Sequence, residues 1–181
     1  MSKQKKILLL ICAFVLAGLV SIILLNKSHS VNKAYITNQG EDSVSVVNLD
    51  TLKLEKKISV GKSPLGISIV NSKDIAVVGN IESQSLSIID LKVNEVIKTI
   101  PIDATPLGIV ADADGSRVFI TSWFKNQVLV LSTHDLTISE AFNVGATPSG
   151  ITFNEDYNLI IIANRDENTL EMYDAESFKL K

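Results

Sequence analysis

The sequence predicts an all-β fold made of successive four-stranded antiparallel sheets, and three observations support this prediction. The chain repeats every 42 residues without a gap, with one proline and one glycine marking each copy: Pro64, Pro106, Pro148, Gly66, Gly108 and Gly150. Within each copy, short runs of β-branched and apolar residues alternate with polar ones, which is the period of a strand. Beyond the first thirty residues, no segment has the period of a helix. A repeat of about 40 to 50 residues with several strands per copy is typical of a β-propeller blade.

Four strands are expected in each complete copy, and the third copy shows them in order. Residues 108–111 form the first strand, and a polar turn follows at 112–115. Residues 118–122 form the second strand, 128–131 the third, and 142–144 belong to the fourth. Each run is bounded by Asn, Asp, Gly or Ser, the residues that commonly end strands.

The proline and glycine of each copy have a structural explanation. The innermost strands of a propeller crowd around its axis, and a glycine entering such a strand permits close approach of another backbone. The proline two residues earlier stiffens the crossing between blades. We expect Pro101 in an outermost strand, where a missing N–H costs little.

Both ends of the repeat region lack a strand. The first copy begins at Lys33 with a strand of the second type, and the fourth stops at 177–181, where its fourth strand should begin. The total is 14 strands, or about 3.5 blades of a partial propeller. Exposed blade faces and unpaired edges invite association, so we expect further blades from a longer chain or from a second subunit.

The first thirty residues differ from the rest. Residues 1–6 contain three lysines and are expected to be cytoplasmic, and residues 7–25 form an unbroken apolar run of 19 residues. As a helix this run spans about 28 Å, enough to cross a bilayer. We expect a transmembrane anchor, with a cleaved signal segment as the alternative. Residues 26–32 then act as a linker, and residues 33–181 form a periplasmic or extracellular repeat domain in a single-pass membrane protein.

Charge and composition exclude some partners and sites. All 20 acidic residues and 13 of the 17 basic ones lie after residue 32, which gives the repeats a net charge of −7. Without a basic patch, nucleic acid is not an expected partner. No cofactor or metal is expected either, because no His or Cys cluster is present. His134 falls at a polar turn, and the Asp112–Ser116 segment reads better as a hairpin turn than as a calcium loop.

One loop departs from its sister copies. The loop after the second strand of the third copy contains Trp123, the chain's one tryptophan, followed by Phe124. This loop is expected on the same face as the blade crossings, with Lys62 and Arg165 nearby. These four residues are the candidate ligand-binding residues; the alternative is that the Trp123 ring packs against the neighbouring blade.

Three segments resemble the YVTN-type β-propeller repeat: Tyr35–Asn38, Ser43–Asn48 and Val60–Ile67. The resemblance covers residues 33–181 and implies a surface-layer or periplasmic propeller, of about seven blades in its complete form. We identify no catalytic constellation, so the expected function is a membrane-anchored, extracytoplasmic, non-catalytic scaffold that binds a protein, glycan or small molecule. The alternative, which rests on fold analogy, is a lactonase-like or haem d1-type propeller with an enzymatic or redox accessory role.

Overall fold

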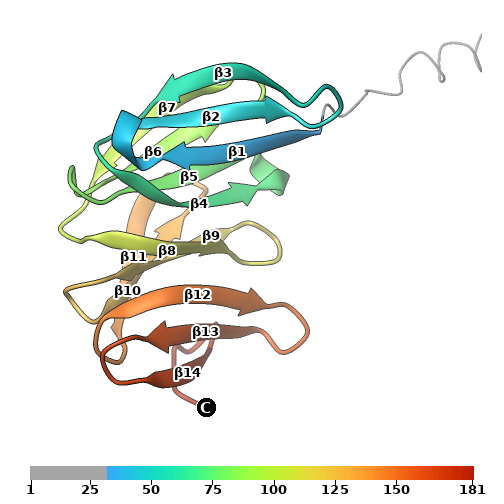
Figure 1. The fold of residues 1–181 in the computed structure, drawn as a ribbon. Helices are drawn as coiled ribbons and strands as arrows, with labels where there is room; N and C mark the ends of the chain where they lie inside the picture. Colours follow the sequence, from blue (N-terminus) through green and yellow to red (C-terminus); the bar gives the residue numbers. More distant parts are fainter. Residues whose placement is uncertain (1–31) are drawn as a thin grey trace, which may run out of the picture. The chain divides into compact units, whose positions relative to one another are not determined.

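Fourteen β-strands form four antiparallel sheets in residues 33–181 (Figure 1), as seen in the computed structural model of the chain, which describes residues 32–181. The first sheet contains β1 (Lys33–Asn38), β2 (Ser43–Asn48) and β3 (Lys53–Ser59). The second contains β4 (Pro64–Val70), β5 (Ile75–Asn80), β6 (Ser85–Asp90) and β7 (Glu95–Pro101). The third contains β8 (Pro106–Ala111), β9 (Arg117–Ser122), β10 (Gln127–Ser132) and β11 (Thr137–Asn143). The fourth contains β12 (Pro148–Asn154), β13 (Leu159–Asn164) and β14 (Thr169–Asp174).

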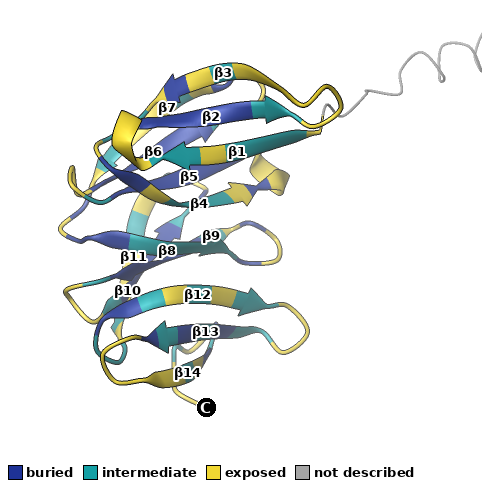
Figure 2. Ribbon diagram, in the orientation of Figure 1, coloured by how far each residue is buried: buried dark blue, intermediate teal, exposed yellow. Residues whose placement is uncertain are grey.

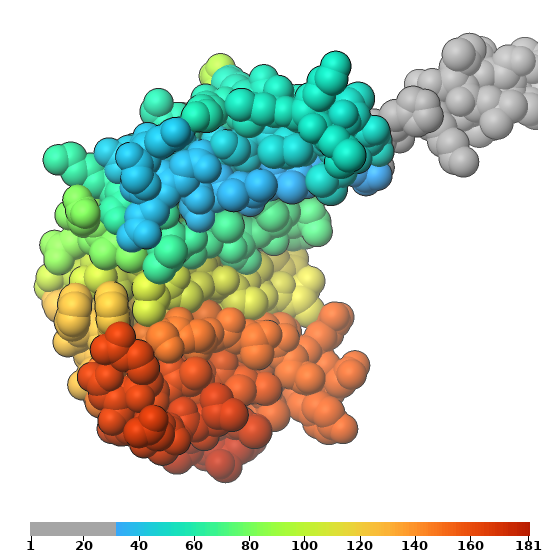
Figure 3. Space-filling view, viewed as in Figure 1, coloured from blue at the N-terminus to red at the C-terminus, as the bar shows by residue number. Residues whose placement is uncertain are grey.

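The strand count and its distribution over the sheets confirm the expectation from the repeat. Each sheet is a meander in which strands pair in chain order. Two short 3₁₀ segments, η1 (Gln39–Glu41) and η2 (Asn71–Lys73), complete the regular structure of the described residues. The fold is propeller-like, with the four sheets following one another from the first to the last (Figure 3).

The first strands of successive sheets lie against one another, as predicted for innermost strands. β8 lies between β4 and β12. A Cβ atom added at Gly66 would lie 2.3 Å from the Leu107 carbonyl oxygen, and one at Gly108 would lie 2.4 Å from that of Ser149. The two glycines are therefore needed for close backbone approach. Pro101 ends β7, the strand at the opposite edge of its sheet, where it was expected.

Three apolar cores fill the spaces between successive sheets, because each strand alternates its side chains between two faces. Between the second and third sheets lie Val77, Leu86 and Ile88 from one side and Val118, Ile120 and Leu131 from the other. The core between the first two sheets contains Val44, Val46 and Ile58, with Ala76, Val78 and Ile89 opposite. The core between the last two contains Phe119, Val128 and Val130, with Ile160, Ile162 and Tyr173 opposite.

The two end sheets have three strands each. In the first, no strand of the described residues pairs with the free edge of β1. In the fourth, a single bridge between Tyr173 and Leu180 stands where the repeat places the start of a fourth strand. Figure 2 shows that most residues of β14 are exposed or half-buried, unlike those of the equivalent strands in the inner sheets.

The predicted membrane span, residues 7–25, lies outside the described residues, as do the stub at 1–6 and most of the linker. In the part of the chain that the structure describes, no helix has the length and apolar character needed to cross a membrane.

Candidate binding surface

The loops after the second strands and the crossings between sheets share one end of the sheets, here called the loop face. Each of three such loops begins with a residue whose main-chain N–H donates to a crossing carbonyl. Ile81 donates to Ser63 (3.1 Å), Trp123 to Thr105 (3.0 Å) and Arg165 to Thr147 (3.1 Å). The predicted coincidence of loops and crossings is thus correct, and backbone hydrogen bonds fix it.

Three of the four candidate residues meet on the loop face. The Trp123 and Phe124 rings stack with centroids 5.0 Å apart and an interplanar angle of 12°. The Arg165 guanidinium carbon lies 5.0 Å from the centroid of a Trp123 ring. Trp123 is half-buried, whereas Phe124 is 74% exposed. Phe124 is therefore the accessible part of this group, which we call the aromatic cluster (Trp123, Phe124 and Arg165).

The repeat explains why Trp123 and Arg165 touch. They are 42 residues apart, so they occupy the same position in successive sheets. The Arg165 side chain therefore reaches back across the junction to the tryptophan, in a cation–π contact worth about 0.5–1 kcal/mol at an exposed site. Both alternatives raised by the sequence contribute, since the tryptophan packs against a residue of the next sheet while its neighbour faces solvent.

Polar contacts hold the arginine in place. Arg165 Nε lies 3.0 Å from Asp166 Oδ1, and the Thr147 hydroxyl donates to Asp166 Oδ2 at 2.6 Å. The hydrogen bond from Thr147, and then that from Arg165, lower the pKa of the Asp166 carboxyl. Asp166 therefore stays ionised beside the guanidinium. The Trp123 Nε1 atom is buried and has no hydrogen-bond partner among the described residues.

Lys62 lies on the loop face as predicted, but at a different junction. Its main-chain N–H donates to Ser83 Oγ (2.9 Å), and its carbonyl accepts from the Glu82 N–H (3.3 Å). Its repeat equivalents are Ala104 and Ala146. No contact in the described part of the chain joins Lys62 to the aromatic cluster.

A coordinated pair of changes distinguishes the junction beneath Trp123. A Cβ atom at Gly61 would lie 2.6 Å from the Asn80 side chain, and one at Gly145 would lie 2.3 Å from that of Asn164. In the third copy, Ser122 takes the asparagine position, and Asp103, in the crossing between β7 and β8, takes the glycine position. The Asp103 side chain is 90% exposed and forms an ion pair with Lys125 of the Trp123 loop.

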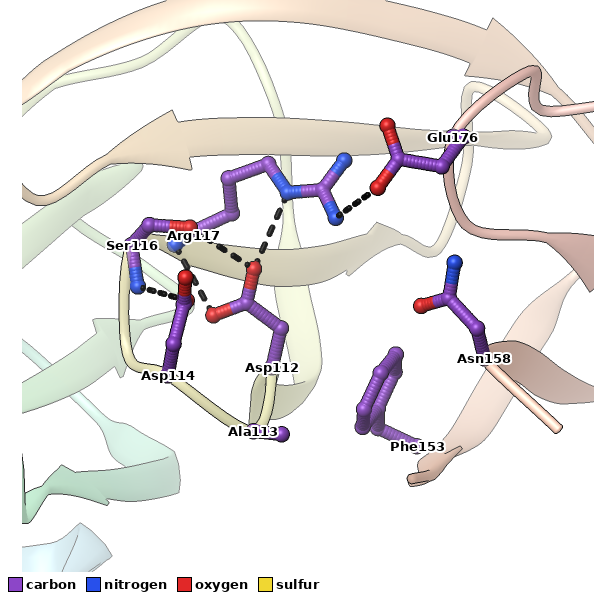
Figure 4. Close-up of a pocket in the computed structure, with 8 residues that line it drawn as sticks. All are labelled: Asp112, Ala113, Asp114, Ser116, Arg117, Phe153, Asn158 and Glu176. Atoms are coloured by element: carbon purple, nitrogen blue, oxygen red, sulfur yellow. Dashed lines mark hydrogen bonds and ion pairs between the residues drawn. The ribbon is translucent and has the colours of Figure 1, made fainter. Parts of the chain in front are cut away.

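The opposite end of the sheets, here called the turn end, contains a cleft of about 500 Å³ between the third and fourth sheets (Figure 4). Asp112, Ala113, Asp114, Ser116 and Arg117 line it on one side, with Phe153, Asn158 and Glu176 on the other. Sequence reasoning missed Arg117 altogether. The signal was available: Asp112 and Arg117 replace Val70 and Ile75 of the second copy, a simultaneous change to a carboxylate and a guanidinium.

The polar groups on the Asp112–Arg117 side of this cleft hydrogen-bond mostly to one another. Arg117 Nε donates to Asp112 Oδ2 (2.9 Å), and its Nη1 donates to the Ala175 carbonyl (2.7 Å). Asp112 also accepts from the Ser116 hydroxyl at 3.1 Å and from the Arg117 N–H at 3.0 Å. Hydrogen bonds from Ser116 lower the pKa of Asp114. The Asp112–Ser116 segment is thus a hairpin turn held by its own hydrogen bonds. Several polar groups that line the cleft are therefore not free to bind a ligand.

No group of metal-ligating side chains occurs in residues 32–181. His134 is exposed on the turn end, between β10 and β11.

Comparison with known proteins shows the fold alone. No protein-family model matches the sequence, and no curated protein matches it. The structure is similar to hydrazine synthase from Kuenenia stuttgartiensis, with a TM-score of 0.77 and 21% sequence identity. The match covers 82% of this chain and 44% of the hydrazine synthase chain, so the chain spans less than half the length of that protein.

Proposed function

We propose that this protein is a binding scaffold whose contact surface is the aromatic cluster on the loop face. The observation that carries the proposal is the stacking of Phe124 on Trp123 and the contact of Arg165 with Trp123. The Phe124 ring is 74% exposed and stacks on the half-buried Trp123 ring, and Arg165, from the loop after the second strand of the next sheet, contacts the tryptophan. An exposed aromatic ring stacked on a supported one presents a preformed, flat, apolar surface.

The residue types of the cluster suit recognition of a partner. Aromatic residues and arginine are enriched in protein–protein interfaces, and tryptophan and arginine dominate the residues whose truncation costs most binding energy. The backbone hydrogen bond from Trp123 to the Thr105 carbonyl and the ion pair of Lys125 with Asp103 preorganise the loop. Less conformational entropy is then lost on binding, which favours affinity.

The cellular setting of this scaffold follows from sequence features outside the described residues. We place the repeats outside the cytoplasm on a membrane anchor at residues 7–25, preceded by three lysines that remain inside. The resemblance of residues 33–181 to YVTN-type repeats supports the same setting. A partner would then be an extracytoplasmic protein, a glycan or a small molecule.

Affinity capture tests the proposal. The full chain is immobilised in mild detergent, and a membrane extract of the producing organism is passed over it. We expect the Trp123→Ala, Phe124→Ala and Arg165→Ala variants to lose a component that the wild type and Tyr157→Ala retain, with melting temperatures of the Phe124→Ala and wild-type chains alike. Tyr157 is the matched control, because it is 75% exposed but lies at the turn end. Retention of the same components by all three cluster variants would overturn the proposal.

A further inference from the structure

The last sheet presents apolar residues whose equivalents are buried in every other sheet. Leu170 is 70% exposed, whereas Val44, Leu86 and Val128 at the same repeat position are fully buried. Met172 is 44% exposed, whereas Val46, Ile88 and Val130 are fully buried. We call Ile161, Leu170 and Met172 the trailing face, because the equivalent residues of each earlier sheet pack against the sheet that follows it.

The first sheet shows the complementary arrangement on its opposite side. Ile36 is 51% exposed, whereas Val78, Ile120 and Ile162 at its repeat position are fully buried. Those three residues pack against the sheet that precedes theirs. We call Ala34, Ile36 and Val47 the leading face. A trailing face and a leading face are therefore the two halves of the junction that the chain forms three times internally.

We propose that the trailing face of one copy of this chain packs against the leading face of a second copy, head to tail. The contact continues an interface that the molecule already uses: residues equivalent to Leu170 and Met172 meet the residue equivalent to Ile36 in all three internal cores. The leading face of a second copy offers the trailing face the same repeat positions that it meets in the internal junctions. This contact covers the apolar side chains of the trailing face on one copy and the exposed Ile36 on the other.

Such a contact is heterologous, so each copy keeps one free face of each kind until a ring closes. Two copies contribute eight sheets, since the described residues of each form four. Known propellers have about four to eight blades, so two copies can close a ring. The expected assembly is therefore a dimer with two equal junctions. This inference is independent of the aromatic cluster, which lies at the loop face.

Glutamate substitutions test the contact directly. In the full chain, Leu170→Glu blocks the trailing face and Ile36→Glu blocks the leading face, and both residues are already exposed, so the fold should survive. Light scattering in mild detergent should give a dimeric mass for the wild type and a monomeric mass for each variant alone. An equimolar mixture of the two variants should recover dimers, because it restores one unblocked junction. Leu52→Glu is the matched control, since Leu52 is 80% exposed at the β2–β3 turn and should leave the dimer unchanged.

Cross-linking establishes the direction of the contact and does not depend on detergent. One chain carries Ile36→Cys and a second, tagged chain carries Met172→Cys, both in a Cys12→Ser background that removes the native cysteine. A short bismaleimide applied to the expressing cells should join the two chains when they are co-expressed, and should join neither chain to a copy of itself.

Three results would overturn the proposal. The first is a monomeric wild-type chain without cross-links, which would assign the two faces to further sheets and not to a second copy. The second is self-cross-linking of the Met172→Cys chain, which would indicate a symmetric trailing-to-trailing contact. The third is a dimeric mass that both glutamate variants retain.

Discussion

Gly108 and Gly150 occupy the same position in successive copies, yet a methyl group would meet different surroundings at each. At Gly108, an added Cβ would lie 2.4 Å from the Ser149 carbonyl oxygen and 3.0 Å from Ile151 Cγ2. At Gly150, its nearest neighbour would be Ala163 Cβ at 3.7 Å, an ordinary van der Waals contact. The difference arises because β12 lies against β8, whereas no inner strand of a following sheet lies against β12 among the described residues.

The structure supplies the magnitude for Gly108→Ala. The first obstacle is backbone, so β8 or β12 must shift, and overpacking of this kind costs about 1–3 kcal/mol. The Thr121 hydroxyl, which accepts from the Gly108 N–H at 2.8 Å and donates to the Ser149 carbonyl at 3.2 Å, would lose one of these hydrogen bonds. That loss adds about 1 kcal/mol. The total destabilisation is about 2–4 kcal/mol, or a fall in melting temperature of roughly 5–15 °C for a region of this size.

Gly150→Ala is the internal control. It removes unfolded-state freedom without a clash, so it should be neutral or should stabilise by up to about 1 kcal/mol. Thermal unfolding of both full-length variants, followed by circular dichroism, gives the comparison. Equal melting temperatures for the two variants would show that β8 does not pack closely against β12 at Gly108.

Three further predictions concern other contacts of the repeat. Gly61→Ala should destabilise the fold by about 1–3 kcal/mol, because the added Cβ would lie 2.5 Å from Ser83 Oγ and 2.6 Å from the Asn80 side chain. Combined with Asn80→Ser, it should cost less than the sum of the two single substitutions, as measured by urea unfolding; strict additivity would show that the added methyl group and the Asn80 side chain do not compete for space. Asp112→Val and Arg117→Ile should each destabilise the fold by about 2 kcal/mol, less than the cost of breaking a fully buried ion pair, because the arginine is partly exposed. The double variant restores the residue types of the second copy and should regain most of this stability. Hydrogen bonds from the Ser177 N–H, and then from Lys181 and the Ser177 hydroxyl, hold the pKa of Asp174 well below its ordinary value of 3.8. The stability that ionised Asp174 contributes is therefore present above pH 3.8 and is lost as the pH falls below it. Protection of the last four backbone amides from hydrogen exchange should drop on acidification in the wild type and should not change in Asp174→Asn.

Much of the fold could be predicted because the 42-residue register alone determines which positions of successive copies meet. The register placed Gly66 and Gly108 in crowded inner strands, Pro101 at an outer edge, and one missing strand in each end sheet. These predictions succeeded because each depends on the position within a copy and not on side-chain detail.

The candidate site was predicted only in part, since side-chain contacts across a junction depend on both copies. Trp123 and Arg165 do meet, but Lys62 was grouped with them only because it shares the loop face, and its own repeat position puts it at another junction. Arg117 was missed because the comparison of the Asp112 turn with the second copy covered only the turn residues 71–73, whereas the ion-pair partner of Asp112 begins the next strand. The paired change appears when the comparison extends to Val70 and Ile75, the positions equivalent to Asp112 and Arg117.

Photo-cross-linking in living cells tests most directly whether the aromatic cluster is the contact surface. Phe124 is replaced by benzoylphenylalanine in the full chain, and Tyr157, equally exposed at the turn end, carries the same replacement as the control. Illumination should join the position-124 chain to a discrete partner, with the adduct lost when Trp123→Ala or Arg165→Ala is added, and should give no such adduct at position 157. Adducts that are equally abundant at both positions, or that are unchanged by those two substitutions, would contradict the proposed binding surface.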